Sequence, residues 1–136
     1  MGVFEFDLDP TSPLTVPQQL ARQVRQAVRL GTLREGETLP PIDAVSRRLG
    51  VGRGTVGNAY RDLGREGFVT AVGGSGTWVT GRYAAEPRAV YADVGQAFER
   101  LLVAAQGAGL DDETVDALYE TTARNLRREA KRGRVV

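Results

Sequence analysis

The sequence GVGRGTVGNAYRDLGREG, residues 50–67, has the spacing of an amphipathic helix although it is rich in glycine. Its apolar residues follow the i, i+3, i+4, i+7 pattern that gathers side chains on one helical face. They are Val56, Ala59, Tyr60 and Leu63. The helix is expected to resume after Gly52 and to end at Gly67, because glycine is favoured just beyond a helix. The expected outward face holds Arg53, Gly54, Gly57, Asn58 and Arg61.

A shorter helix precedes this one and ends at Gly50, with Ile42, Val45 and Leu49 on one face. Two short helices joined by a tight turn that contains glycine make a helix-turn-helix. Upstream, TVPQQLARQVRQAVRLG predicts a helix over residues 16–30, with proline in its first turn and glycine at its end. Phe4, Phe6 and Leu8 alternate before it, as in a short strand or an extended arm.

Downstream, FVTAV and TWVT flank the four-residue polar turn GGSG, which predicts a β-hairpin. A helix, a helix-turn-helix and a hairpin in this order predict a winged helix-turn-helix over residues 1–80. The expected fold class is α+β, mostly α, with a small helical region at the C-terminal end of the sequence.

Composition bounds the possible chemistry. A chain of 136 residues that is 41% hydrophobic can bury one modest core, or one compact domain with a short helical appendage. It has no cysteine and no histidine, which removes thiolate zinc sites, cysteine nucleophiles and the commonest general base. We therefore expect no catalytic residues, no metal and no cofactor. The acidic N-terminal stretch and the short apolar runs predict a soluble cytoplasmic protein without membrane contact.

The net charge of +1 hides a local concentration of positive charge. Residues 44–65 hold five arginines and a single acid, Asp62. Such a patch in a nearly neutral chain indicates a polyanionic partner. A second basic cluster, at residues 124–134, follows the acidic start of a predicted helix. That order complements the helix macrodipole, which we prefer over nucleic-acid binding as its explanation.

Three segments together resemble the DNA-binding domain of GntR-family transcriptional regulators. They are DPTSPLTVPQQLARQVRQAVRLGTLREGETLPP, LGVGRGTVGNAYRDLGREGFV and GGSGTWV. The resemblance is nearly collinear from about Phe6 to Val79. It implies a sequence-specific regulator, with the family's tendency toward repression, that places its third helix in the major groove of double-stranded DNA.

The resemblance gives individual roles to the exposed residues. The guanidinium of Arg53 is expected to read guanine through O6 and N7. Asn58 either pairs with adenine or is a solvated helix residue, while Thr55 and Arg61 are expected to contact phosphates. The wing is expected to contact phosphate through backbone N–H groups. The predicted DNA-contacting residues are Asp43, Arg47, Arg48, Arg53, Gly54, Thr55, Gly57, Asn58, Arg61, Gly74, Ser75 and Gly76.

Departures from the family pattern qualify this prediction. Asp43 lies near the place where the family commonly has an arginine in its second helix, and Gly57 replaces a second arginine four residues after Arg53. Gly52 replaces the usual Ser or Thr cap. Either the bare surface lets backbone and Arg53 approach a different operator, or the module has turned to a protein partner. We favour retained DNA binding with altered specificity. Asp43 would repel a phosphate but could accept a hydrogen bond from cytosine N4.

The remaining sequence comprises a linker, residues 81–88, and a helical region, residues 89–136. Its two helices carry apolar stripes and are too small to enclose a metabolite pocket. This arrangement resembles the YtrA-type subfamily, whose short C-terminal region serves mainly to dimerise, and implies a homodimer on a palindromic operator. The alternative is that the helices fold back on their own winged helix. A small-molecule effector could also bind, although no residues identify its site. The predicted dimerisation residues are Val94, Phe98, Leu101, Leu102, Val115, Leu118 and Leu126.

Overall fold

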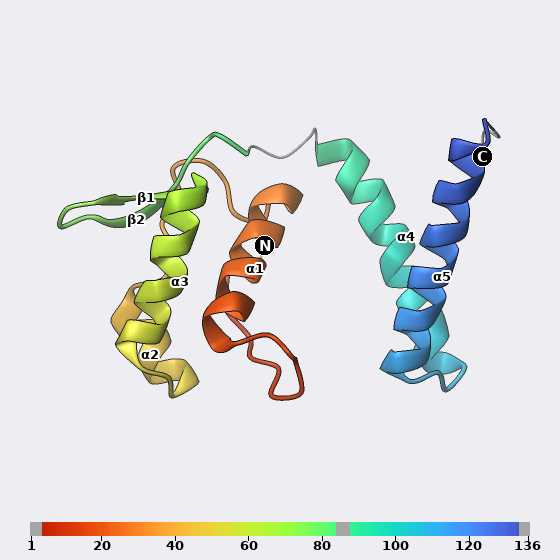
Figure 1. Ribbon diagram of the computed structural model, residues 1–136, viewed down its shortest axis with the longest axis horizontal. Coiled ribbons are helices and arrows are strands. Elements are labelled where there is room, and N and C mark those ends of the chain that lie inside the picture. Colours follow the sequence, from red (N-terminus) through yellow and green to blue (C-terminus); the bar gives the residue numbers. More distant parts are fainter. Residues whose placement is uncertain (1–3, 84–87, 134–136) are drawn as a thin grey trace. The chain divides into compact units, whose positions relative to one another are not determined.

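A computed structural model describes residues 4–83 and 88–133, with side chains described for 4–83 and 92–133. The chain divides into two compact units, Met1–Tyr91 and Ala92–Val136. The described elements follow in the order shown in Figure 1. They are α1 (Val16–Leu30), α2 (Ile42–Leu49), α3 (Arg53–Glu66), β1 (Val69–Val72), β2 (Gly76–Val79), α4 (Arg88–Gly107) and α5 (Asp112–Lys131). The predicted winged helix-turn-helix, mostly helical with one small hairpin, is confirmed.

Helix α1 has the predicted bounds because both of its ends are encoded locally. Thr15 caps its N-terminus by accepting a 3.3 Å hydrogen bond from the backbone N–H of Gln18. The side-chain oxygen of Gln18 in turn accepts a 2.9 Å hydrogen bond from the backbone N–H of Thr15, which completes a capping box. Gly31 ends the helix with φ of 78°, a left-handed conformation that favours glycine.

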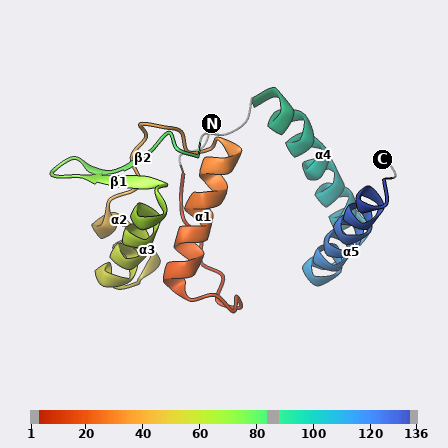
Figure 2. The same cartoon turned by 45° about the horizontal axis from the view of Figure 1, so that its top comes forward.

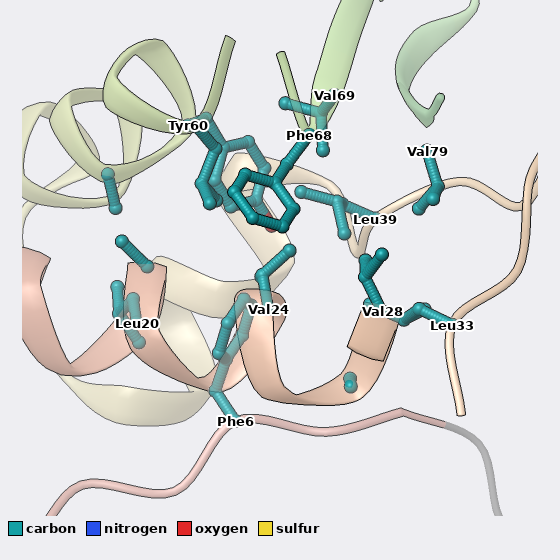
Figure 3. Close-up of a cluster of buried hydrophobic side chains, with 14 of the residues drawn as sticks. Phe6, Leu20, Val24, Val28, Leu33, Leu39, Tyr60, Phe68, Val69 and Val79 are labelled. Atoms are coloured by element: carbon teal, nitrogen blue, oxygen red, sulfur yellow. The ribbon is translucent and has the colours of Figure 1, made fainter. Parts of the chain in front are cut away.

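The core of the first unit is formed by α1 and α3 together with residues from the segment before α1, from α2 and the segment before it, and from the wing (Figure 3). Leu20 and Val24 of α1 and Leu63 of α3 are almost completely buried. The residues before α1 form an extended arm, without a described strand, that places Phe6 at the same core with only 1% of its surface exposed. Gln23 fastens this arm, since its side chain accepts from the backbone N–H of Asp7 at 2.9 Å.

The turn between α2 and α3 is held by short-range bonds. Gly50 ends α2 with φ of 68°. The hydroxyl of Ser46 donates to the carbonyl of Val51 at 2.6 Å, and the N–H of Val51 donates to the carbonyl of Ser46 at 3.2 Å. The hydroxyl of Tyr60 in α3 donates to the carbonyl of Pro40 at 2.6 Å. Because Pro40 comes just before α2, this bond fixes the start of α2 against α3.

Replacing Tyr60 by phenylalanine is expected to cost about 1 kcal/mol of folding free energy at neutral pH, since the carbonyl of Pro40 loses its donor. Burial raises the pKa of Tyr60 above its usual value of 10. The folded state therefore holds the proton more tightly than the unfolded chain, and its stability falls as pH rises above about 10. Phenylalanine cannot ionise, so the difference between the two proteins should narrow there. Urea unfolding of both proteins at pH 7 and above pH 10 measures the difference in their free energies of unfolding. A difference that stays constant with pH would contradict the prediction.

The wing is an antiparallel hairpin in which Val69 pairs with Val79 and Val72 pairs with Gly76. Its turn has three residues between the strands instead of the four expected, because Gly76 belongs to β2. Gly76 has φ of 96°, which explains why glycine occupies this position. The segment before α2 lies along β2, where the N–H of Leu39 donates to the carbonyl of Thr77 at 2.8 Å. Figure 2 shows the hairpin extending away from the helices of its unit.

The second unit, taken by itself, consists mainly of α4 and α5, two helices that are joined by a short turn and diverge away from it (Figure 1). The predicted linker and the observed α4 share Arg88. The predicted start of α5 is confirmed, because the carboxylate of Asp111 accepts from the N–H of Thr114 at 2.9 Å and caps the helix. The rings of Phe98 and Tyr119 lie 6.5 Å apart between the two helices.

Among the described residues, no helix has both the length and the apolar character needed to cross a membrane.

Candidate nucleic-acid interface

Helix α3 has one buried face and one exposed face, as its sequence predicts. Val56, Ala59 and Leu63 have no exposed surface, and Tyr60 has 6%. Arg53, Gly54, Asn58 and Arg61 lie on the solvent side, and Thr55 is partly covered. Arg53, whose side chain is 74% exposed, is the first residue of α3 and so lies at the N-terminal end of this face.

The prediction that Gly57 lies on the outward face of α3 was wrong, because Gly57 is buried. A Cβ atom built at Gly57 would lie 3.6 Å from Nη1 of Arg61, with no closer neighbour. The guanidinium of Arg61 also donates a hydrogen bond to Oδ1 of Asn58. Gly57 is therefore buried beneath the side chain of Arg61, not in the core. By contrast, a Cβ at Gly54 would meet no atom within 4 Å, so the surface at that position is open.

The first residue of α3 makes an ion pair that the sequence analysis did not anticipate. Nε of Arg53 lies 2.6 Å from Oδ1 of Asp43, an acidic residue in the first turn of α2. The two side chains stay 74% and 58% exposed. The substitution of an acid for the arginine expected near this position was the available signal, but the sequence does not show that this acid lies beside Arg53.

The two arginines at the end of α2 differ in their surroundings. Arg47 is exposed. Arg48 donates a hydrogen bond to the backbone carbonyl of Phe6 and so joins α2 to the N-terminal arm. A phosphate contact for either arginine stays a prediction, and for Arg48 the contact would compete with this bond. Further along α3, Arg65 pairs with Asp62 at 2.7 Å.

The tip of the wing is exposed at Gly74, Ser75 and Gly76. The N–H of Ser75 donates to the carbonyl of Val72 at 2.9 Å and closes the turn. The indole of Trp78 donates to the carbonyl of Ser75 at 3.1 Å. The N–H of Ser75 is thus already bonded within the hairpin. Contact between other backbone N–H groups of this tip and phosphate stays a prediction.

Comparison with known proteins identifies the family. Residues 17–79, which span α1 to β2, match the family model described as bacterial regulatory proteins, gntR family. Residues 17–79 form a GntR-family domain. All of the predicted DNA-contacting residues lie in the matched segment, and α4 and α5 lie outside it.

Two curated relatives illustrate how far the similarity extends. The pyridoxine biosynthesis transcriptional regulator PdxR of Corynebacterium glutamicum is 42% identical over 72 residues, which are 53% of this chain and 16% of PdxR. The transcriptional repressor YtrA of Bacillus subtilis is 27% identical over 73 residues, which are 54% of this chain and 56% of YtrA. The chain thus aligns with about a sixth of the first relative and just over half of the second.

A solved structure extends the likeness beyond the winged helix. YtrA from Sulfolobus acidocaldarius, a GntR-family transcription factor, is 28% identical, with a TM-score of 0.52. The similarity covers 72% of this chain and 97% of that one. Together with the B. subtilis repressor, it makes this chain YtrA-like.

Proposed function

We propose that this GntR protein is a homodimeric, sequence-specific DNA-binding transcriptional regulator that represses promoters by occupying a palindromic operator. The observation that carries the proposal is the exposed face of α3. A fully buried apolar seam orients this face outward, and its cations lie in the segment shared with the GntR family. A helix of this kind fits the major groove of B-DNA, and guanidinium groups suit both base edges and phosphates.

Dimerisation is proposed from the apolar surface of the second unit. Phe98 and Leu101 of α4 are 48% and 56% exposed, and Leu118 and Leu126 of α5 are also exposed. Val94 and Leu102 extend the exposed stripe on α4, whereas Val115 is partly covered. A contiguous apolar surface of this kind is typical of an interaction site. A second copy is the partner that we propose, because it would present two copies of α3 to the two halves of a palindrome.

The central test is selection of bound duplexes from random or genomic DNA with the purified protein. A selected duplex should bind more tightly than a scrambled duplex of the same composition. The logarithm of its affinity should also fall linearly with the logarithm of the salt concentration. The slope should be several, because each phosphate that the protein neutralises releases counterions. Equal affinity for the two duplexes, or a flat response to salt, would refute the proposal.

Alanine in place of the glycines of α3 should separate helix stability from DNA approach. Gly54→Ala and Gly57→Ala are each expected to raise the free energy of unfolding by about 0.5–1 kcal/mol, since neither new methyl meets an atom closer than 3.6 Å. Gly54→Ala should weaken operator binding, because its methyl group would stand on the open surface and hold the DNA away from the helix, whereas Gly57→Ala should change affinity little, because Arg61 covers that position.

Gly64→Ala is the matched control for these two changes. It lies in the same helix, and its Cβ would stand 3.8 Å from the carbonyl of Val69. It should stabilise the protein similarly and leave DNA affinity unchanged. Thermal unfolding and DNA titration of the three variants measure both effects. Unchanged affinity in Gly54→Ala would show that the backbone of α3 does not approach DNA closely.

A protein-interaction module is the second candidate function. It is favoured by the pairing of the exposed arginines of α3 within their own chain. Arg53 pairs with Asp43, Arg65 pairs with Asp62, and Arg61 bonds to Asn58. Failure of the duplex selection would favour this candidate.

A further inference from the structure

The ion pair between α2 and α3 joins the starts of both helices. Arg53 is the first residue of α3, and Asp43 is the second residue of α2. The start of α2 is held against α3, because the hydroxyl of Tyr60 in α3 donates to the carbonyl of Pro40 just ahead of α2. The turn bonds between Ser46 and Val51 hold the other end of α2. The backbone of Asp43 is therefore held near the N-terminal end of α3, with its carboxylate against Nε of Arg53.

Folding stability does not account for this pair. Ion pairs between side chains as exposed as these contribute little, because water and salt screen them. A cation in the first turn of a helix also lies at the unfavourable end of the macrodipole. The sequence thus places an arginine where it gains little for the fold and gives it a carboxylate partner on the neighbouring helix.

The geometry determines which part of the guanidinium stays available. Asp43 lies against Nε of Arg53, the nitrogen nearest the backbone. The two terminal nitrogens remain at the outer end of a side chain that is 74% exposed. Two parallel donors of this kind match O6 and N7 of guanine, and adenine presents a donor in place of O6. Holding them in one orientation before binding also reduces the entropy lost on binding.

We propose that Asp43 is a positioning residue for base recognition, which holds the guanidinium of Arg53 end-on toward one guanine in each half-site. The proposal rests on the DNA-binding function proposed above. Asp43 acts in two ways that favour specific over nonspecific binding. It restrains Arg53 from turning toward nearby phosphates, and its negative charge weakens attachment to DNA of any sequence.

The test compares Asp43→Ala with the unaltered protein on three duplexes. These are the selected duplex, a scrambled duplex, and the selected duplex with the guanine pair of each half-site replaced by an adenine pair. The ratio of specific to scrambled affinity is expected to fall by about two- to fivefold for each half-site, with the scrambled duplex bound more tightly than before. The preference for guanine over adenine should fall by a similar factor. Asp43→Asn, which keeps the shape and removes the charge, should give part of the same loss.

Two controls separate positioning from other roles. Asp62→Ala removes the acid that pairs with Arg65 at 2.7 Å in the same helix, and it should change affinity for all duplexes alike. In an Arg53→Ala background, Asp43→Ala should no longer change the affinity ratio, because a positioning residue acts only through its partner. Thermal unfolding without DNA checks that each variant is folded.

Other outcomes overturn the inference. If Asp43→Ala raises affinity for every duplex by the same factor, Asp43 only repels DNA. If the loss of discrimination persists without Arg53, Asp43 reads a base itself, as direct acceptance from cytosine N4 would require. Either result leaves DNA binding intact and removes only the positioning role. Absence of any preference in the unaltered protein would instead refute the proposed function.

Discussion

A protein carrying Phe98→Glu together with Leu101→Glu is expected to be monomeric and to bind its operator about a hundredfold more weakly, or worse. Both side chains are large, apolar and about half exposed on α4. In the proposed dimer they would be buried, and two unpaired carboxylates cannot be buried there without a large desolvation penalty. Loss of the dimer separates the two DNA-binding units, and linkage of two such units raises overall affinity by about 10² to 10⁴. Analytical ultracentrifugation and titration of a two-site duplex measure the two effects.

Val103→Glu is the matched control for this change. Val103 belongs to the same helix and is 61% exposed, but at 3.6 residues per turn it faces away from Phe98 and Leu101. The control should remain dimeric with unchanged operator affinity. Binding to a duplex with a single half-site should be equal in all of these proteins, since α3 is untouched. A double variant that stays dimeric would place the interface elsewhere, and a monomer with full affinity would remove dimerisation from the mechanism.

The second large effect is expected from Arg53→Ala. A bidentate contact between arginine and guanine discriminates by about 1–3 kcal/mol, and a palindrome holds two such contacts. Specific affinity should therefore fall by about 30-fold or more. Affinity for scrambled DNA should fall by a smaller factor, because loss of Arg53 removes one positive charge and leaves the carboxylate of Asp43 unbalanced.

Arg65→Ala provides the contrast for this variant. Arg65 lies near the C-terminal end of α3, where a phosphate contact would carry no sequence information. This variant should lose affinity by the same factor on every duplex, and its salt slope should decrease by about one. Equal specificity in the Arg53→Ala variant and the unaltered protein would show that another residue reads the operator.

The elements of the first unit were predictable because their signals are local. The cap at Thr15 and the stop at Gly31 lie within one turn of α1, and they define its bounds in the structure. The seam of α3 follows from helical periodicity alone, with Val56 and Leu63 fully buried as expected. Turn chemistry was less certain, since Gly76 was assigned to the turn but forms the first pair of β2 with Val72.

Interactions between side chains of different elements were not predictable in the same way. The pairing of Asp43 with Arg53 depends on the angle between α2 and α3, which periodicity does not report. Gly57 was assigned to the exposed face by its helical position, but the conformation of the Arg61 side chain buries it. The bond from Arg48 to the carbonyl of Phe6 joins residues 42 positions apart and required the tertiary structure.

The burial of Phe6 has a practical consequence for shortened forms of this protein. The family match begins at residue 17, which suggests a minimal reading head that starts at α1. A fragment cut there would lose the aromatic ring that fills the space beside Leu20 and Tyr60, and it would leave the guanidinium of Arg48 without its acceptor. Truncated versions intended for operator titrations therefore have to retain the arm from Phe4 onward, or a weakened fold would be mistaken for poor recognition of DNA.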